Sequence, residues 1–374
     1  MVNRKRLRDE FCRLVSIDSV SYRERAMADE LSFLLRELGF QVEEDAAGAR
    51  CGGNCGNLYG ILEGELKGDP ILLSAHMDTV EPGIGKRAVI QKDGRISSDG
   101  STVLGADDVS GLVAILEAVR TVKEQGLAHR TIEILFPIAE EVYILGSSFF
   151  DYSRVKAKEA YVLDLTGPVG TAALQAPTLV SFTARIKGKA AHAGFAPEEG
   201  INAIAIAAEA VTGVKQGRID PRTTVNIGQI EGGLAKNIVS DLCVLKGEVR
   251  SLDHAACLSE AEKLERCFQE TAKKYHAVCE YESSFGCYAY EVKPEHPVVT
   301  RFVRACEELH LPVSLIPTFG GSDNNNFVRN GITGIVLACG MNQVHSCQEY
   351  TTVEELARCS EIVIRLITDK QVDE

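Results

Sequence analysis

Several residues that can bind metal ions or transfer protons follow directly after apolar stretches of this sequence. The run ILLSA at residues 71–75 leads into His76 and Asp78, and ILFPIA at 134–139 leads into Glu140 and Glu141. Asp164 ends a further predicted strand, His345 follows the last one, and Asp107 begins a predicted helix. Imidazole combined with carboxylate, without thiolate, suits zinc, manganese or cobalt better than magnesium, which prefers oxygen ligands and water.

Each of these residues alone has an ordinary explanation, since Asp often caps a helix and Glu after a strand is usually solvated. Together they point to a metal centre. The carboxyl ends of strands in an open α/β sheet meet at one edge, where several acids would repel one another unless a cation neutralised them. Two ions about 3.5–4 Å apart, with a bridging carboxylate, an acidified water and a general base, form a known hydrolytic device. The spacing is compatible with one ion or with two.

The elements that must position these residues follow two patterns. In the first part of the chain, strands alternate with a helix: the strands are predicted at about 57–63, 71–75, 131–138 and 160–164, and the helix at about 107–125. The same alternation returns near the C-terminus, with a helix at 297–309, a strand at 334–339 and a helix at 353–368. Between them, residues 178–285 predict strand, helix, two strands, helix and strand, which is the ferredoxin-like order. We therefore expect an α/β domain with a mostly parallel sheet, residues 1–176 and 291–374, and an inserted α+β domain, residues 177–290.

Composition excludes several classes of protein. With 374 residues, 45% of them hydrophobic, the chain can bury large cores, and a formal charge of −13 disfavours nucleic acid or anionic membranes as main partners. No segment approaches the roughly 20 apolar residues of a membrane span, and the N-terminus lacks the apolar core of a secretory signal. The twelve cysteines are scattered in a chain large enough to do without disulfides, so we expect reduced thiols and a cytoplasmic protein.

The ordered motifs resemble a known family, the co-catalytic di-zinc exopeptidases and deacylases that include peptidase T, glutamate carboxypeptidases, aminoacylase and acetylornithine deacetylase. The resemblance spans the chain through SAHMDTV, GADDVSG, AEEVYILGS, VLDLTG, GKAAHAG, GGLAKNIVSD, GEVRSLD, GGSDNNNF and VHSCQEYTTV. GADD together with GGSD is most similar to the peptidase T branch. The resemblance implies a zinc-exopeptidase-like catalytic domain with an inserted lid or dimerisation domain.

The resemblance also implies roles at the metal centre. Asp107 would bridge two zinc ions, with cobalt or manganese as alternatives; His76 and Asp164 would complete one site, and Glu141 and His345 the other. Asp78 would orient a ligand. Glu140 would be the general base that takes a proton from the water and passes it to the leaving amine.

In the inserted domain, His192 resembles a family histidine that reaches the partner's active site in a homodimer and stabilises the oxyanion. Asn237 and Arg250 resemble residues that hold the substrate, Arg250 by a bidentate grip on a carboxylate. Taken alone, His192 is an ordinary loop histidine and Arg250 a solvated arginine at a strand end. Gly320 and Gly321, with Ser322 and Asp323, are expected to shape the pocket through close backbone approach, and Asp323 is given no chemical step.

The predicted function is a metal-dependent exopeptidase acting on short peptides, in the manner of a di- or tripeptide aminopeptidase. A serine hydrolase is disfavoured because G-x-S-x-G is absent, and GIGKR at 83–87 lacks the rest of a nucleotide-binding loop. Two alternatives remain: an amidohydrolase or carboxypeptidase acting on N-acyl amino acids, and a non-catalytic metal-binding homologue. Glu140 and the full ligand set argue against the second.

Overall fold

A computed structural model of the protein describes residues 1–370, and contacts within the chain divide it into two compact units. Unit 1 comprises Met1–Gln175, Glu291–Thr318 and the described residues from Ser322 onward, and unit 2 comprises Ala176–Tyr290 with Phe319–Gly321. Residues 319–321, which the sequence analysis assigns to the catalytic domain, therefore pack with unit 2.

A large mixed sheet forms the centre of unit 1. Among the described residues its strand order is β1-β2-β6-β3-β7-β18-β8-β16, and β17 pairs with β8. The strands are β1 (Gln41–Glu44), β2 (Leu58–Leu62), β3 (Ile71–Ser74), β6 (Ile132–Phe136), β7 (Glu159–Thr166), β8 (Thr171–Ala176), β16 (Tyr290–Glu291), β17 (Ser314–Pro317) and β18 (Thr333–Met341). The four central strands β6, β3, β7 and β18 are parallel neighbours, so their carboxyl ends lie at one edge.

The sheet is antiparallel towards its edges, where β2 pairs with β1 and β6 and β18 pairs with β8. The prediction of a mostly parallel sheet therefore fits the centre better than the flanks. Residues 63–70 connect β2 to β3, and this link is shorter than the crossover of a dozen or more residues that parallel strands need. This explains why β2 runs antiparallel to the central strands.

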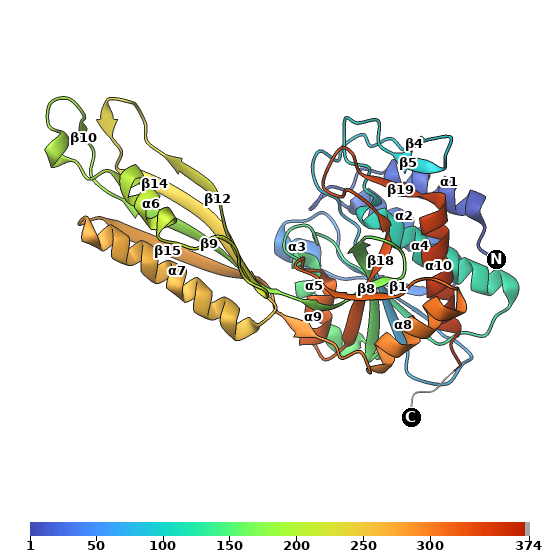
Figure 1. Ribbon diagram of the computed structural model, residues 1–374. Coiled ribbons are helices and arrows are strands. Elements are labelled where there is room, and N and C mark those ends of the chain that lie inside the picture. Colours follow the sequence, from blue (N-terminus) through green and yellow to red (C-terminus); the bar gives the residue numbers. More distant parts are fainter. Residues whose placement is uncertain (371–374) are drawn as a thin grey trace. The chain divides into compact units, whose positions relative to one another are not determined.

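Helices cover both faces of this sheet (Figure 1). Phe327 of α9 packs with Ala160 and Val162 of β7 on one face, whereas Tyr161, which points to the other face, bonds to the carbonyl of Val298 in α8. On that second face α4 and α10 contact β18, and α1 covers both helices. The helices of unit 1 are α1 (Arg4–Val15), α2 (Arg25–Glu37), α3 (Ala47–Cys51), α4 (Ala106–Gln125), α5 (Leu145–Ser148), η1 (Tyr152–Arg154), α8 (Pro297–Glu308), α9 (Asp323–Arg329) and α10 (Val353–Thr368).

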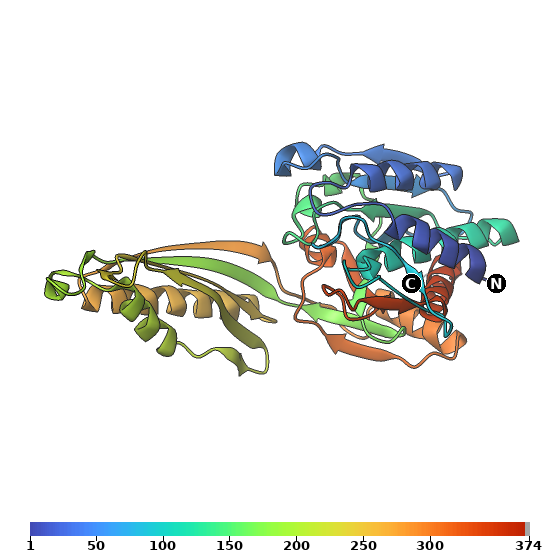
Figure 2. The ribbon, with the colours of Figure 1, turned by 90° about the horizontal axis from the view of Figure 1, so that it is seen from above.

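Unit 2 is built on an antiparallel sheet of order β11-β12-β14-β9-β15, seen clearly in Figure 2, with α6 and α7 packed on it. Its four long strands follow the ferredoxin-like order, because the first strand in sequence lies between the third and the fourth. The elements are β9 (Thr178–Lys187), β10 (Ala191–His192), η2 (Pro197–Glu199), α6 (Ala203–Thr212), β11 (Gly217–Asp220), β12 (Thr223–Gly232), β13 (Ile238–Val239), β14 (Leu242–Ser251), α7 (His254–Lys274) and β15 (Val278–Cys287).

Two smaller features complete the fold. A three-stranded sheet joins β4 (Val89–Ile90), β5 (Arg95–Ser97) and β19 (Tyr350–Thr352), and β10 pairs with β13 in unit 2.

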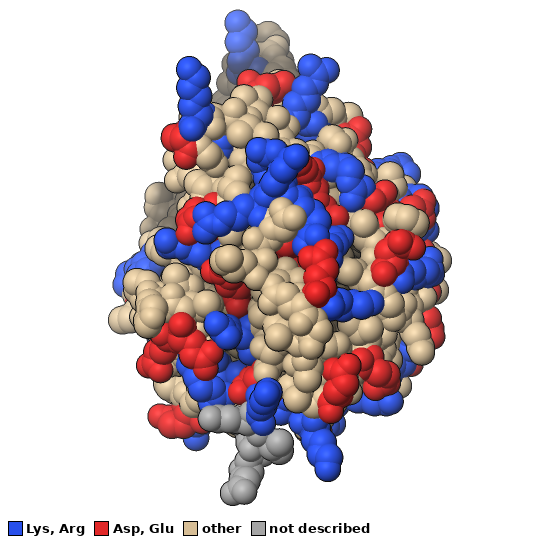
Figure 3. Space-filling model, turned by 90° about the vertical axis from the view of Figure 1, so that its right-hand side faces the viewer, with Lys and Arg blue, Asp and Glu red and all other residues tan. Residues whose placement is uncertain are grey.

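On the face drawn in Figure 3, Lys and Arg interleave with Asp and Glu, unlike the basic stripe that nucleic-acid binding requires. Within residues 1–370, every helix is too short or too polar to span a membrane.

Candidate metal centre

The predicted ligands come together at the carboxyl edge of the central strands. His76 and Asp78 follow β3, Glu140 and Glu141 follow β6, and His345 follows β18. Asp164 lies within β7 rather than after it, and Asp107 lies at the start of α4. Ligand positions at the ends of neighbouring parallel strands are where α/β sheets bind their ligands.

Asp107 lies between the two histidines. Its Oδ1 is 3.0 Å from Nε2 of His76, and its Oδ2 is 3.2 Å from Nε2 of His345. Burial would raise the pKa of this carboxyl, but the hydrogen bonds to His345 and His76 outweigh burial and hold the pKa well below its usual range. One carboxylate that offers a separate oxygen to each of two imidazoles has the arrangement that a bridging ligand needs.

The remaining acids surround this centre. Glu141 lies 3.0 Å from Nε2 of His345, while Asp164 and Glu140 lie 3.9 Å and 4.0 Å from Nε2 of His76. Two groups of side chains are close enough to hold an ion among the described residues: His76 with Asp107 and Glu141, and His76 with Glu140 and Asp164. By distance alone Glu140 and Glu141 therefore both qualify as ligands near His76, which leaves their division into base and ligand a prediction.

The charge of the cluster calls for a cation. Burial raises the pKa of Glu140 and of Asp164 far above the usual range, and a neighbouring carboxylate raises each further, Asp164 acting on Glu140 and Asp107 on Asp164. Burial likewise raises the pKa of Glu141. Several buried carboxylates that resist ionisation together are stabilised when a divalent ion compensates their charge. The donor set of imidazole and carboxylate thus fits a metal centre.

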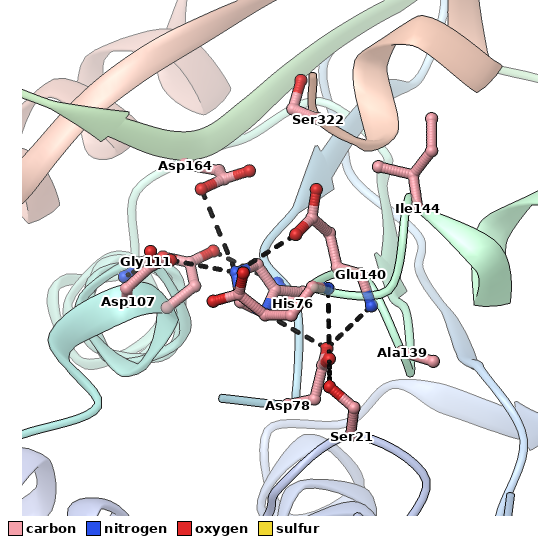
Figure 4. A network of polar contacts seen from close by, with 12 residues as sticks. Ser21, His76, Asp78, Asp107, Gly111, Ala139, Glu140, Ile144, Asp164 and Ser322 are labelled. Carbon is pink, nitrogen blue, oxygen red and sulfur yellow. Dashed lines mark hydrogen bonds and ion pairs between the residues drawn. The ribbon is translucent and has the colours of Figure 1, made fainter. Parts of the chain in front are cut away.

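Asp78 fixes several parts of the site at once (Figure 4). Its Oδ1 lies 3.3 Å from Nδ1 of His76 and accepts the backbone N–H of Glu140 at 2.9 Å. Its Oδ2 accepts the N–H of Glu141 at 3.2 Å and the hydroxyl of Ser21 at 2.6 Å. This fully buried carboxylate therefore has the contacts that the predicted orienting role requires.

Backbone strain is concentrated beside the candidate ligands. The described non-glycine residues with positive φ include Ala139, Tyr143 and Ile144 around the Glu140–Glu141 pair, and Gln343 and His345 after β18. Left-handed backbone is costly for residues with a Cβ, most of all for a β-branched one, and it persists where surrounding contacts impose it. The metal-binding loops are therefore held in shape by their neighbours.

Those neighbours are residues that sequence reasoning did not single out. Glu24 accepts the N–H of Ala139 at 3.0 Å, Asn57 accepts that of Ile138 at 3.0 Å, and Asn326 donates to the carbonyl of Ile144 at 3.1 Å. Glu349 and Asp108 accept backbone N–H groups of Asp107 and His76 respectively. Glu349 lies in the VHSCQE segment, which is one of the family motifs, but the groups that it contacts are distant in sequence.

The predicted residues of unit 2 fall into two places. His192 and Asn237 come together across the β10–β13 pair, where the N–H of Ala193 donates to the carbonyl of Asn237 at 3.0 Å. The exposed His192 ring accepts the N–H of Gly194 at 3.1 Å and stacks on Phe195.

Arg250 lies elsewhere, in β14, where it is partly exposed and its guanidinium is paired within the protein. Its Nε and Nη2 donate to Glu248 at 2.8 and 3.1 Å, and its Nη1 donates to the carbonyl of Phe319 at 2.8 Å. The expected bidentate grip is thus directed at a carboxylate of the protein itself. Gly320 and Gly321 are exposed residues that follow Phe319 in unit 2.

Comparison with known proteins places these features in a family. Residues 176–276 match the M20 peptidase dimerisation domain and residues 57–211 match peptidase family M28. YqjE, an uncharacterised protein of Bacillus subtilis, is 38% identical over 99% of both chains. The aminopeptidase PepT of Bacillus cereus is 39% identical with a TM-score of 0.91, and a Staphylococcus aureus tripeptidase is 33% identical with a TM-score of 0.96, each over 98% of both chains.

The chain belongs to the peptidase T-like M20 peptidases. The predicted resemblance and the predicted fold class are therefore confirmed. The M20 dimerisation match lies within unit 2. The M28 match, residues 57–211, includes four of the five metal-ligand candidates, His76, Asp107, Glu141 and Asp164, and His345 lies outside it.

Proposed function

We propose that this chain is a metal-dependent aminopeptidase that hydrolyses short peptides such as tripeptides. The observation that carries the proposal is the position of Asp107, whose two carboxylate oxygens face His76 and His345 separately. Similarity over nearly the full chain to an aminopeptidase and to a tripeptidase supports the peptide as substrate class.

Two divalent ions fit the donor set, and zinc is the ion we favour. Asp107 would be shared, His76 and Asp164 would complete one site, and Glu141 and His345 the other. Ions bound there would polarise the scissile carbonyl and lower the pKa of water to near neutrality.

Glu140 is the proposed general base. Asp78 accepts the backbone N–H of Glu140 and thereby fixes the position of its backbone. Burial beside Asp164 raises the pKa of the Glu140 carboxyl well above its usual range. With bound ions compensating the charge of its neighbours, Glu140 would be ionised and could take a proton from the attacking water and pass it to the leaving amine.

Unit 2 supplies the other proposed roles. The match to a peptidase dimerisation domain supports a homodimer in which His192 donates to the oxyanion of the partner's site. Asn237, Arg250, Gly320 and Gly321 are the proposed substrate contacts. Because Glu248 already occupies the guanidinium of Arg250, a substrate carboxylate would have to share or displace that pair.

The twelve cysteines are all free, seven of them beyond residue 260, and this supports a reducing compartment such as the cytoplasm. The substrate class is tested with metal-loaded protein and matched peptides. Unblocked tripeptides should be cleaved, and the same peptides with an acetylated N-terminus should not. Preference for N-acyl amino acids would contradict the aminopeptidase proposal and favour a deacylase.

A further inference from the structure

Glu349 is a buried carboxylate to which none of the roles above has been given. It is 1% exposed, and both of its oxygens accept backbone N–H groups from the loop that carries Asp107. Oε1 accepts the N–H of Asp107 at 2.9 Å, and Oε2 accepts the N–H of Gly105 at 2.7 Å. A buried carboxylate that receives two directed donors is a strong and geometrically specific contact.

The contact holds an irregular stretch of backbone at the start of α4. Asp107 and Asp108 have non-helical backbone angles, and Asp108 Oδ1 accepts the N–H of Gly111 at 3.1 Å where the regular helix begins. The N–H groups of Gly105 and Asp107 lie before that point and need acceptors from elsewhere in the chain. Glu349, which is 244 residues from Gly105 in sequence, accepts both.

Glu349 belongs to the same short segment as His345. The N–H of Glu349 donates to the carbonyl of Ser346 at 3.1 Å, and the ends of the segment are tied together where Asn342 and Tyr350 exchange two 3.0 Å hydrogen bonds. One compact loop thus approaches Asp107 twice, with the Glu349 carboxylate at its backbone and the His345 imidazole 3.2 Å from its side chain.

We propose that Glu349 is a positioning residue that joins the His345 loop to the backbone of Asp107 and so sets the geometry of the ion site formed by Asp107, Glu141 and His345. The proposal rests on the proposed function, because it requires that this site bind an ion. Glu349 is not one of the proposed ion ligands, because its two oxygens accept backbone N–H groups. Since the His345 loop serves only this site, loss of Glu349 should affect it more than the one completed by His76 and Asp164.

The variant Glu349→Gln tests this with little change in volume. A glutamine offers only one acceptor oxygen, and its amide N–H₂ would face one of the two donors, so one of the backbone contacts must break. The matched control is Glu354→Gln, which removes a carboxylate from an exposed position on α10 that pairs with Arg4 and Arg358.

The first measurement is zinc affinity, determined by competition with a chelating dye at a temperature where circular dichroism shows each protein folded. In Glu349→Gln, one of the two zinc affinities should fall about 10–100-fold, the usual effect of losing a residue that orients ligands, and the other should stay within about twofold. Glu354→Gln should leave both unchanged. A role limited to global stability would lower the melting temperature but leave both affinities of the folded variant intact, and that result would overturn the proposal.

The second measurement needs no metal. Amide hydrogen exchange at Gly105 and Asp107 should be slow in the metal-free wild-type protein and faster in Glu349→Gln, and unchanged exchange would also overturn the proposal. Wild-type protein that binds fewer than two ions would contradict the proposed function instead, and the exchange result would still decide whether Glu349 holds the loop. Should Glu349→Gln not fold, Glu349→Asp replaces it, because its shorter side chain keeps both oxygens but not their reach.

Discussion

At the scale of single residues, adjacent acids after one strand are separated by their contacts. Glu141 lies against His345, whereas Glu140 lies 4.0 Å from His76 and is influenced most strongly by Asp164 among the charged groups. The sequence predicted both residues, because strand ends locate them, and it assigned their different tasks through a family resemblance. By distance both residues qualify as ligands, so the assignment stays a prediction that substitution must test.

Glu140→Gln should keep its metal and lose turnover by about 10²–10⁴, because general acid-base catalysis typically contributes that factor. Glu141→Gln is the matched comparison, and it should instead lose affinity for one ion. Steady-state kinetics and elemental analysis on both variants make the check. Full turnover in Glu140→Gln would remove this residue from the mechanism.

Glu24 should make the stability of the metal-free protein depend on pH. Burial, with a smaller contribution from Asp78, raises its pKa to about 7 from its ordinary value of 4.5. A raised folded-state pKa means that the folded chain binds more protons than the unfolded chain between these values, so the free energy of unfolding falls as pH rises from about 5 to 7. Urea titrations of chelator-treated protein should show this decline, and Glu24→Gln should make it less steep, because other buried carboxyls such as Glu140 and Asp164 contribute in the same direction. An equal slope in both proteins would contradict the assigned pKa.

At the scale of elements, strand ends could be predicted and the anchors of the loops could not. His76, Asp164 and His345 were found because apolar runs reveal where strands end and parallel neighbours share an edge, and Asp107 was found at the start of a predicted helix. Asn326 escaped notice, since its partners Ile144 and Ser147 are about 180 residues away and no local pattern encodes them. The pairing of Arg250 with Glu248 was open to prediction, because residues two apart on a strand share a face.

Asn326→Ala should destabilise the loop that carries Glu140. The amide donates to the carbonyl of Ile144 at 3.1 Å and to the hydroxyl of Ser147 at 2.9 Å, both buried, and leaving these acceptors unsatisfied costs about 1–3 kcal/mol in the free energy of unfolding. Turnover should fall as the strained backbone relaxes. The control is Asn330→Ala, which removes a partly buried bond at the end of the same helix. Equal, small losses in both variants by urea unfolding would show that α9 does not anchor the loop.

At the scale of the whole molecule, the chain combines a central α/β unit with an inserted unit of ferredoxin-like order, as its two sequence styles predict. The change in the order of predicted strands and helices marks the insertion well. However, segment 319–321 belongs to unit 2, where Arg250 contacts the carbonyl of Phe319, and only a three-dimensional contact reveals that. Short pairs such as β10–β13 were also missed, because two-residue strands carry no periodicity.

A homodimer that shares His192 across subunits makes a prediction for mixed chains. Glu140→Gln and His192→Ala should each be nearly inactive alone, the latter by about 10²–10³ as for other oxyanion donors. After mixing, some heterodimers carry one site with both groups intact, so part of the activity should return. Native mass spectrometry establishes that mixed dimers formed. Mixed dimers without recovered activity would exclude a shared site.

The central claim is that Asp107 bridges two ions, and metal stoichiometry tests it most directly. Elemental analysis after dialysis against zinc should give two ions per wild-type chain, one for His345→Ala and none for Asp107→Ala, because only the shared ligand serves both sites. A wild-type protein that is fully active with one ion at saturation, or an Asp107→Ala variant that keeps two, would contradict the account.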